Sequence, residues 1–195
     1  MDIKLILAIF AILLNIVGGF SVYLFSIFRG TTKPHIYTWL IWTITGVVAL
    51  LALIRGQGGW GALPLVFSTT FVFVIFLLSF KFGTKNITKF DTIVLAVALL
   101  AIVVWFYMHN PLLAVVLVTI ADCLGYLPSF RKTFQEPWTE SVTSWTVYFF
   151  CGLLMILSMN EYNFLTLTYL GVTNVANIIL ITICLVRRRV VKLSL

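Results

Sequence analysis

One acidic residue stands apart from the other groups in this chain that could do chemistry. Asp122 lies inside an apolar stretch, nine residues before Arg131, whereas the other five acidic residues lie at the ends of such stretches or between them. At a rise of about 1.5 Å per residue, a helix would place Asp122 roughly 13 Å inside that stretch. A carboxylate in the middle of a bilayer costs at least about 2.5 kcal/mol and therefore faces the protein interior. We expect Asp122 to accept and release protons; a structural hydrogen bond to a neighbouring helix is the alternative.

Two asparagines form a second polar position. Asn174 and Asn177 are three residues apart, so they lie on one face of a helix. Counted from Arg187, they are about 15 to 20 Å inside their apolar stretch. An amide carries donors and acceptors without a charge, which suits a neutral polar or zwitterionic ligand. We predict both as ligand contacts; hydrogen bonding between helices is the alternative.

Aromatic residues recur near the start of two apolar stretches. Trp39 and Trp145 stand where the tryptophans of an interfacial belt are expected, and we predict that role for them. Trp42 and Tyr148 lie about one helical turn further in, and a facing pair of rings can sandwich a flat or apolar ligand. We therefore predict Trp42 and Tyr148 as substrate contacts.

The residue arrangements that enzymes and metal sites need are missing from the sequence. No nucleophile, base and orienting residue recur at a helical spacing, and no phosphate-binding loop is present. The three cysteines, Cys123, Cys151 and Cys184, lack the paired spacing of a disulfide framework or a metal site. We predict that the protein is not an enzyme and uses no metal and no cofactor.

The elements that must position these residues are apolar helices. The chain has 195 residues, of which 62% are hydrophobic and only 10% charged, against about 25% charged in soluble domains. A helix needs about 20 mostly apolar residues to cross a bilayer. Seven such stretches are visible, at 5–27, 36–54, 62–80, 92–108, 111–130, 142–158 and 164–186. We predict an integral membrane protein with seven transmembrane helices.

The placement of positive charge predicts an orientation. Seven crossings put the termini on opposite sides, and only Lys4 and Arg55 of the 13 basic residues fall on the side of the N-terminus. Basic residues prefer the cytoplasmic side, so we expect an external N-terminus and a cytoplasmic C-terminus, most simply in the cell (inner) membrane. The net charge of +7 is explained by topology and contact with anionic lipid, without nucleic acid.

The chain contains an internal repeat. At an offset of 103 residues, Tyr23, Leu24, Ser26, Arg29 and Pro34 fall on Tyr126, Leu127, Ser129, Lys132 and Pro137. At an offset of 106, Trp39, Gly46 and Lys81 fall on Trp145, Gly152 and Arg187. We predict a first three-helix bundle at 1–84, a linker helix at 85–109 and a second bundle at 110–195. The linker makes the two bundles parallel, as in repeats related by an axis along the membrane normal.

On these residues the chain resembles the SWEET and PQ-loop superfamily, whose members join two three-helix bundles by a linker helix in a 3+1+3 order. The Pro-Gln signature of that superfamily is present in part: Pro128 is followed by Ser129 in the second copy, and Phe25 by Ser26 in the first. The resemblance implies an all-α transporter of a sugar, an amino acid or another small solute that works by alternating access.

The resemblance also implies site residues. SWEET-like proteins bind substrate through an asparagine in the last helix of each bundle, a position that Asn174 resembles, with Ser68 as its partner in the first copy. Some PQ-loop amino-acid exporters use an intramembrane aspartate in proton coupling, as Asp122 would. Leu50 and Ile156 stand where sugar-carrying members have tryptophan, so the resemblance does not specify a sugar.

Pro128 and Gly125 are candidates for a hinge. Proline inside a helix removes a backbone hydrogen bond and kinks the helix. The alternative is that Pro128 begins to end its helix before the following loop.

Together these features predict a transporter of a small polar solute, by uniport or proton coupling. Two other functions stay open: a vitamin or nucleoside carrier of the same architecture, and a non-transporting seven-helix receptor or sorting factor. Assembly into a homo-oligomer is also open.

Overall fold

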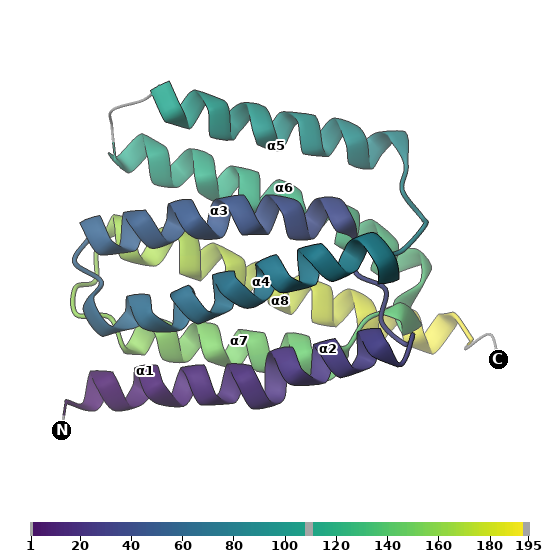
Figure 1. Cartoon of the computed structure of the whole chain (residues 1–195), viewed down its shortest axis with the longest axis horizontal. Coiled ribbons are helices and arrows are strands. Elements are labelled where there is room, and N and C mark those ends of the chain that lie inside the picture. The colour runs from purple at the N-terminus through teal and green to yellow at the C-terminus, as the bar shows by residue number, and fades with distance from the viewer. Residues whose placement is uncertain (1, 108–110, 193–195) are drawn as a thin grey trace.

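The computed structural model describes residues 2–107 and 111–192, and every regular element within these ranges is a helix. The α-helices are α1 (Ile3–Leu14), α2 (Ser21–Phe28), α3 (Ile36–Arg55), α4 (Ala62–Phe82), α5 (Lys89–Tyr107), α6 (Pro111–Gln135), α7 (Val142–Leu157) and α8 (Phe164–Val190). A π-helical segment, η1 (Asn15–Phe20), joins α1 and α2 into one rod, and short turns of 3-10 helix form η2 (Gly59–Gly61) and η3 (Pro137–Thr139). The described ranges thus hold seven helical rods, one for each predicted stretch, and the all-α prediction is confirmed (Figure 1).

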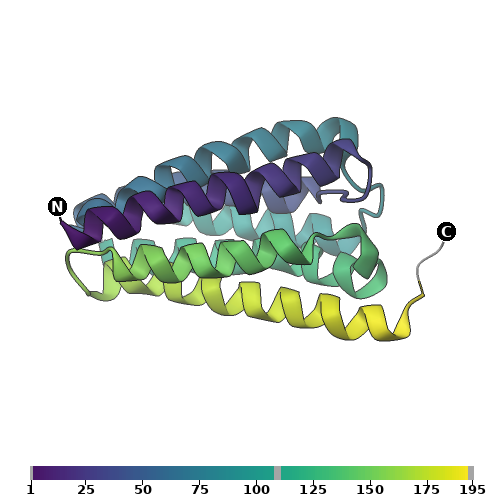
Figure 2. The same ribbon diagram turned by 90° about the horizontal axis from the view of Figure 1, so that it is seen from below.

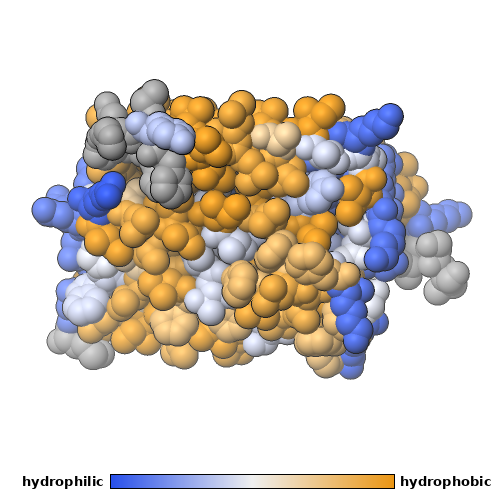
Figure 3. All heavy atoms as spheres, turned by 45° about the horizontal axis from the view of Figure 1, so that its top comes forward, coloured by the Kyte–Doolittle hydropathy of each residue, from blue (hydrophilic) through white to orange (hydrophobic). Residues whose placement is uncertain are grey.

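The surface and the helix lengths are those of an integral membrane protein. Four rods are long and apolar enough to cross a bilayer: Ile3–Phe28, Ile36–Arg55, Gly59–Phe82 and Phe164–Val190. Helix α7 is also apolar but shorter, with 16 residues. On the face drawn in Figure 3, apolar side chains form a broad band between two hydrophilic ends.

The rods lie side by side in a bundle, with α5 at one edge (Figures 1 and 2). Helix α4 packs against α3 and α1, and α8 packs against α7 and α6. Across the bundle, α3 contacts α6, while α7 contacts α1 and η1. Helix α5 packs on α6 and, less extensively, on α3.

The π-helical segment lets the first rod approach α7 closely. A Cβ atom on Gly19 would lie 2.6 Å from Cε1 of Tyr148, and one on Gly18 would lie 3.2 Å from a methyl group of Val147. A side chain at Gly19 would therefore have to displace the Tyr148 ring, whereas one at Gly18 would press on Val147 by a few tenths of an ångström. Single π-helical turns occur often at functional sites, and both ends of this one, Asn15 and Phe20, are buried.

Helix α6 continues past its proline. It runs from Pro111 to Gln135 with Pro128 inside it, so the interpretation that Pro128 ends the helix is wrong. The neighbouring α3 is bonded to α6 beside this proline: Thr38 Oγ1 donates a hydrogen bond to the carbonyl oxygen of Gly125 (2.8 Å) and accepts one from Ser129 Oγ (3.0 Å). A hinge at Gly125 and Pro128 stays a prediction.

Two buried apolar clusters fill the bundle at different depths. We call the end where α2 and α6 terminate and α3 and α7 begin the basic end, because it carries eleven of the 13 lysines and arginines. The cluster nearer the basic end contains Tyr23, Trp39 and Trp145. The second cluster, toward the opposite end, contains Leu53 and Met159.

A buried ion pair joins several elements at the basic end. Lys132 near the end of α6 pairs with Glu140, and their side chains are 0% and 1% exposed. Lys132 Nζ also donates to the carbonyl oxygens of Lys33 (2.8 Å) and Thr139 (3.3 Å), and Glu140 accepts from Trp145 Nε1 (2.9 Å). These bonds fasten the loop after α2 to α6 and α7.

Removing one member of this pair will leave the other as an uncompensated buried ion. We expect Lys132→Met or Glu140→Gln to lower the free energy of unfolding by about 3–5 kcal/mol, and the double variant to lose much less than the sum. Denaturant unfolding in detergent of the wild type, the two single variants and the double variant measures these free energies. Lys85→Met, at an exposed lysine, is the control, with an expected change below about 0.5 kcal/mol. Additive losses would contradict the pairing.

A buried histidine lies beside a second ion pair. His35, directly before α3, is fully buried, and its Nε2 is 3.5 Å from Oδ2 of Asp91. Arg131 donates to both carboxylate oxygens of Asp91, at 3.0 and 2.7 Å. Burial lowers the pKa of His35 from 6.5 to about 4, because the cost of desolvating an imidazolium and the repulsion of Lys132 outweigh the attraction of Asp91.

This shift predicts a loss of stability in acid. Between pH 6.5 and about 4 the unfolded chain binds a proton at His35 that the folded protein does not, so stability falls as the pH falls, by up to about 1.4 kcal/mol per pH unit. Thermal unfolding of the wild type and of His35→Gln across this range measures the difference. In His35→Gln the stability should depend less steeply on pH in this range, because the titrating imidazole is absent. Identical profiles of stability against pH for both proteins would show that His35 does not titrate there.

Candidate functional site

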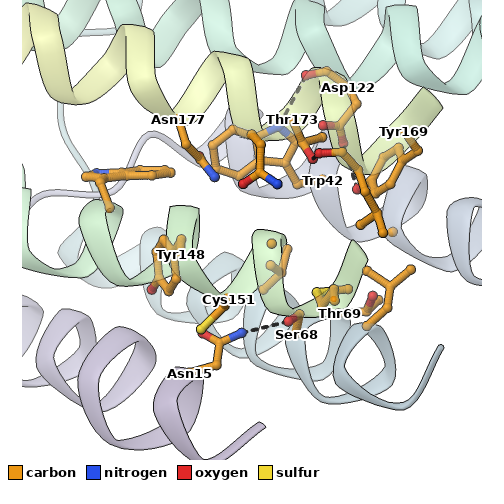
Figure 4. Close-up of a pocket in the computed structure, with 18 of the residues that line it drawn as sticks. Asn15, Trp42, Ser68, Thr69, Asp122, Tyr148, Cys151, Tyr169, Thr173 and Asn177 are labelled. Carbon is orange, nitrogen blue, oxygen red and sulfur yellow. Dashed lines mark hydrogen bonds between the residues drawn. The ribbon is translucent and has the colours of Figure 1, made fainter. Parts of the chain in front are cut away.

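A cavity of about 130 Å³, with polar side chains set in a mainly apolar wall, lies between the two apolar clusters. Six of the seven rods contribute to its lining, and none of the described residues of α5 does. The six residues predicted for substrate binding and proton coupling all line it: Asn174 and, as labelled in Figure 4, Trp42, Ser68, Asp122, Tyr148 and Asn177. Gly125 and Pro128 do not line it. The geometry brings the six together, and what they bind stays a prediction.

Asp122 is 2% exposed and is bonded by two hydroxyl groups from other helices. Thr45 Oγ1 donates to its Oδ1 at 2.5 Å, and Tyr169 OH donates to the same oxygen at 3.3 Å. Trp42 Nε1 donates to the backbone carbonyl oxygen of Asp122 (3.2 Å), which fixes the ring beside the carboxylate. In the described part of the chain, Asp122 has no cationic partner and its Oδ2 makes no hydrogen bond.

The hydroxyl of Thr45 allows Asp122 to be charged or neutral in place. Thr45 Oγ1 has one hydrogen but two acceptors in reach, Asp122 Oδ1 and the carbonyl oxygen of Ile41 (3.0 Å). It can donate to an ionised Asp122, or accept from a protonated Asp122 and donate to Ile41. A proton can therefore be taken up or released without the movement of any heavy atom.

Asn174 presents an unused amide to the cavity. Its side chain is buried, and neither Oδ1 nor Nδ2 has a hydrogen-bond partner among the described residues. The amide occupies the space beside Gly152 where a Cβ atom would stand. Buried polar groups are nearly always bonded, so this bonding capacity is available to an occupant of the cavity.

Asn177, by contrast, already has an interhelical bond. Its Oδ1 accepts from Tyr126 OH at 2.9 Å, which ties α8 to α6. This contact is of the interhelical kind that the sequence left open as the alternative, and a ligand contact of Asn177 stays a prediction.

Asn15 is a lining residue that the sequence interpretation missed. Its Nδ2 donates to Ser68 Oγ (2.8 Å), while its Oδ1 is buried without a partner in the part described. The same depth count that singled out Asn174 would have found it, since Asn15 is an isolated amide 14 residues before Arg29 in the first apolar stretch.

Ser68 is not the spatial counterpart of Asn174. A Cβ atom on Gly46 would lie 2.9 Å from Thr69 Oγ1, just as one on Gly152 would meet Asn174. The expected correspondence is therefore wrong by one position. The reason is that one residue is about 100° of helix rotation, which turns Ser68 toward the first rod and Thr69 toward α3.

Trp39 and Trp145, which lie about one helical turn nearer the helix starts than Trp42 and Tyr148, are core residues. Trp39 and Trp145 are each 2% exposed, so their predicted place in a lipid-facing belt is wrong. Trp145 packs between Trp42 (ring centroids 5.8 Å apart) and Tyr148 (5.5 Å), so this pair does not sandwich an empty space. Hydropathy alone cannot tell a ring that faces lipid from one that packs against other rings.

Comparison of the chain with models of known protein families, with curated proteins and with solved structures finds no match. The resemblance described above therefore rests on the residues of this chain. Among the described residues, no three His, Cys, Asp or Glu side chains form a group that could hold a metal ion.

The contact between Gly152 and Asn174 predicts the effect of a single methyl group. Gly152→Ala must displace the amide of Asn174, and overpacking of this kind costs about 1–3 kcal/mol. Gly171→Ala on α8 is the matched control, because a Cβ atom there meets nothing within 4 Å. Thermal unfolding should show a loss for the first variant and none for the second. Equal behaviour of both variants would contradict the close packing.

Proposed function

We propose that the protein is a transporter of a small polar solute that works by alternating access around this cavity. The observation that carries the proposal is the cavity itself, in the middle of a bundle of apolar helices and lined by buried polar atoms that have no partner among the described residues. Five such atoms belong to four lining residues: Asn15, Thr69, Tyr148 and Asn174. Polar groups buried in lipid are costly and mark substrate or ion pathways.

The packing of the helices supports a 3+1+3 architecture of the SWEET and PQ-loop kind. In the proposed first bundle α4 contacts α3 and α1, and in the second α8 contacts α7 and α6. The contact of α3 with α6 corresponds to that of α7 with α1. Such a pattern is expected of two bundles related by an axis along the membrane normal, with α5 as the linker.

The apolar clusters on both sides of the cavity support alternating access. One cluster lies between the cavity and the basic end, and the other lies toward the opposite end. In this proposal each cluster is a gate, and a solute held between two closed gates is occluded. The excess of basic residues at one end supports a cytoplasmic C-terminus.

The size of the cavity favours a small solute. A water molecule needs about 10–15 Å³ of such volume, so a cavity of about 130 Å³ has room for on the order of ten non-hydrogen atoms. This is the size of an amino acid or a monosaccharide. The aromatic walls are the observation that favours the alternative, a carrier of a flat vitamin or nucleoside, but such a solute needs a wider state of the cavity.

Flux through purified protein tests the proposal. Proteoliposomes should take up at least one member of a panel of sugars, amino acids, amines and vitamins faster than protein-free liposomes. Loss of the amide in Asn174→Ala should lower that flux by about fivefold or more, because a buried hydrogen bond of the solute is worth about 1–3 kcal/mol.

Val175→Ala is the control. Val175 follows Asn174 in the chain, but its own side chain is 58% exposed on the outside of α8. This variant should keep the wild-type flux. Uptake of no solute on the panel would count against transport, whereas full flux through Asn174→Ala would count against the assigned site alone.

A further inference from the structure

The charge of the cavity is set by one residue. Asp122 is the only acidic residue that lines it, and no described lining residue is lysine, arginine or histidine. The nearest basic residues on α6, Arg131 and Lys132, are about 13 to 15 Å further along the helix and are paired with Asp91 and Glu140. An ionised Asp122 therefore lacks a counter-charge.

One oxygen of this carboxylate is free to meet a ligand. Oδ1 accepts both hydroxyl donors, from Thr45 and Tyr169, while Oδ2 makes no hydrogen bond with the described residues. An ionised carboxylate in an apolar medium is strongly disfavoured unless it is paired and bonded. A proton or a cationic occupant of the cavity is needed at this position.

Aromatic rings line the cavity near the carboxylate. Trp42 lies beside Asp122 (Figure 4), where its Nε1 donates to the backbone carbonyl oxygen of Asp122. The ring of Tyr126 is tilted against that of Trp42, with centroids 4.5 Å apart, and the ring of Trp145 meets it edge-on at 5.8 Å. All three rings line the cavity and are less than 10% exposed. The faces of such rings attract ammonium groups, most strongly where water is excluded.

We propose that the solute is a small organic cation whose positive group is held by Asp122 and the ring faces of Trp42, Tyr126 and Trp145. The inference rests on the proposed transport function and names the class of its solute. The unbonded amide of Asn174 then meets an uncharged polar group of the same solute.

A proton and the cation compete for the same carboxylate. Binding of the cation to protonated Asp122 releases the proton to water, and rebinding of the proton releases the cation, so one positive charge replaces another. The titratable groups around Asp122 are Tyr169 on α8 and Cys123 and Tyr126 on α6. Helices α3 and α5 carry their ionisable groups only at their ends. Asp122 is thus the group at which the proposed exchange of proton and cation takes place.

Binding measurements with a charge-matched pair of probes test this inference. Choline and 3,3-dimethylbutan-1-ol have the same shape, with nitrogen replaced by carbon in the neutral alcohol, and tetramethylammonium serves as a second cation. Calorimetry on the purified full chain in detergent should show at least tenfold tighter binding of choline than of the alcohol. Choline binding should weaken as the pH falls, whereas binding of the alcohol should not change.

Variants then assign the effect to Asp122. In Asp122→Asn the preference for choline over the alcohol should disappear, and in Glu161→Gln, which removes an exposed carboxylate, it should stay. Thermal unfolding checks that each variant is folded, and the comparison of probes on the wild type stands even if Asp122→Asn does not fold.

Three results would overturn the inference: equal affinity for choline and the alcohol, no binding of either cation, or a charge preference that survives in Asp122→Asn. Flux of a neutral solute in the proteoliposome assay together with any of these would leave the transport function standing. Absence of flux for every solute would remove the transport function, and the calorimetric preference would still decide whether the cavity selects cations.

Discussion

The pairing of polar groups in an apolar medium is the constraint on which the rest of this structure depends. The chain meets it at most places, as where Thr38 supplies a donor to the backbone near Pro128. Most of the buried polar atoms that do not meet it lie at the cavity. Of the eight buried side-chain atoms without a partner in the part of the chain that the structure describes, five line the cavity. Each such atom costs about 1–3 kcal/mol. An occupant of the cavity that forms hydrogen bonds with these atoms removes that cost.

The two halves of the chain build this cavity from similar positions with different side chains. Gly46 and Gly152, which correspond at an offset of 106, each leave room for a polar side chain of the following helix. In the first half that side chain is Thr69. At the offset of 103, Asp122 corresponds to Gly19, which leaves room for a tyrosine ring of α7. These corresponding positions thus carry unequal side chains, and among the described lining residues the carboxylate of Asp122 lies on one side alone.

The residues on the two sides of the cavity are held together by different interactions. Toward the basic end, packed aromatic rings are backed by the ion pair of Lys132 and Glu140, which is bonded to three other elements. Toward the opposite end, the buried cluster contains mainly aliphatic and methionine side chains such as Leu53 and Met159. The described residues of the loops beyond it are joined by hydrogen bonds without an ion pair, as where Asn163 Nδ2 donates to the carbonyl oxygen of Gly56 (2.9 Å). The cavity thus lies between a cluster backed by a buried ion pair and one backed by hydrogen bonds.

The sequence by itself determined the seven rods, their bounds to within a few residues and the depth of Asp122 and Asn174, because length, hydropathy and helical rise are properties of single segments. Only the tertiary structure decided that Trp39 and Trp145 are buried, that Asn15 joins the cavity, and which polar atoms are left without a partner. These outcomes depend on how each helix is rotated toward its neighbours. That rotation is set by contacts between residues far apart in the chain, such as glycines that admit a ring or an amide from another helix, and no single segment contains this information.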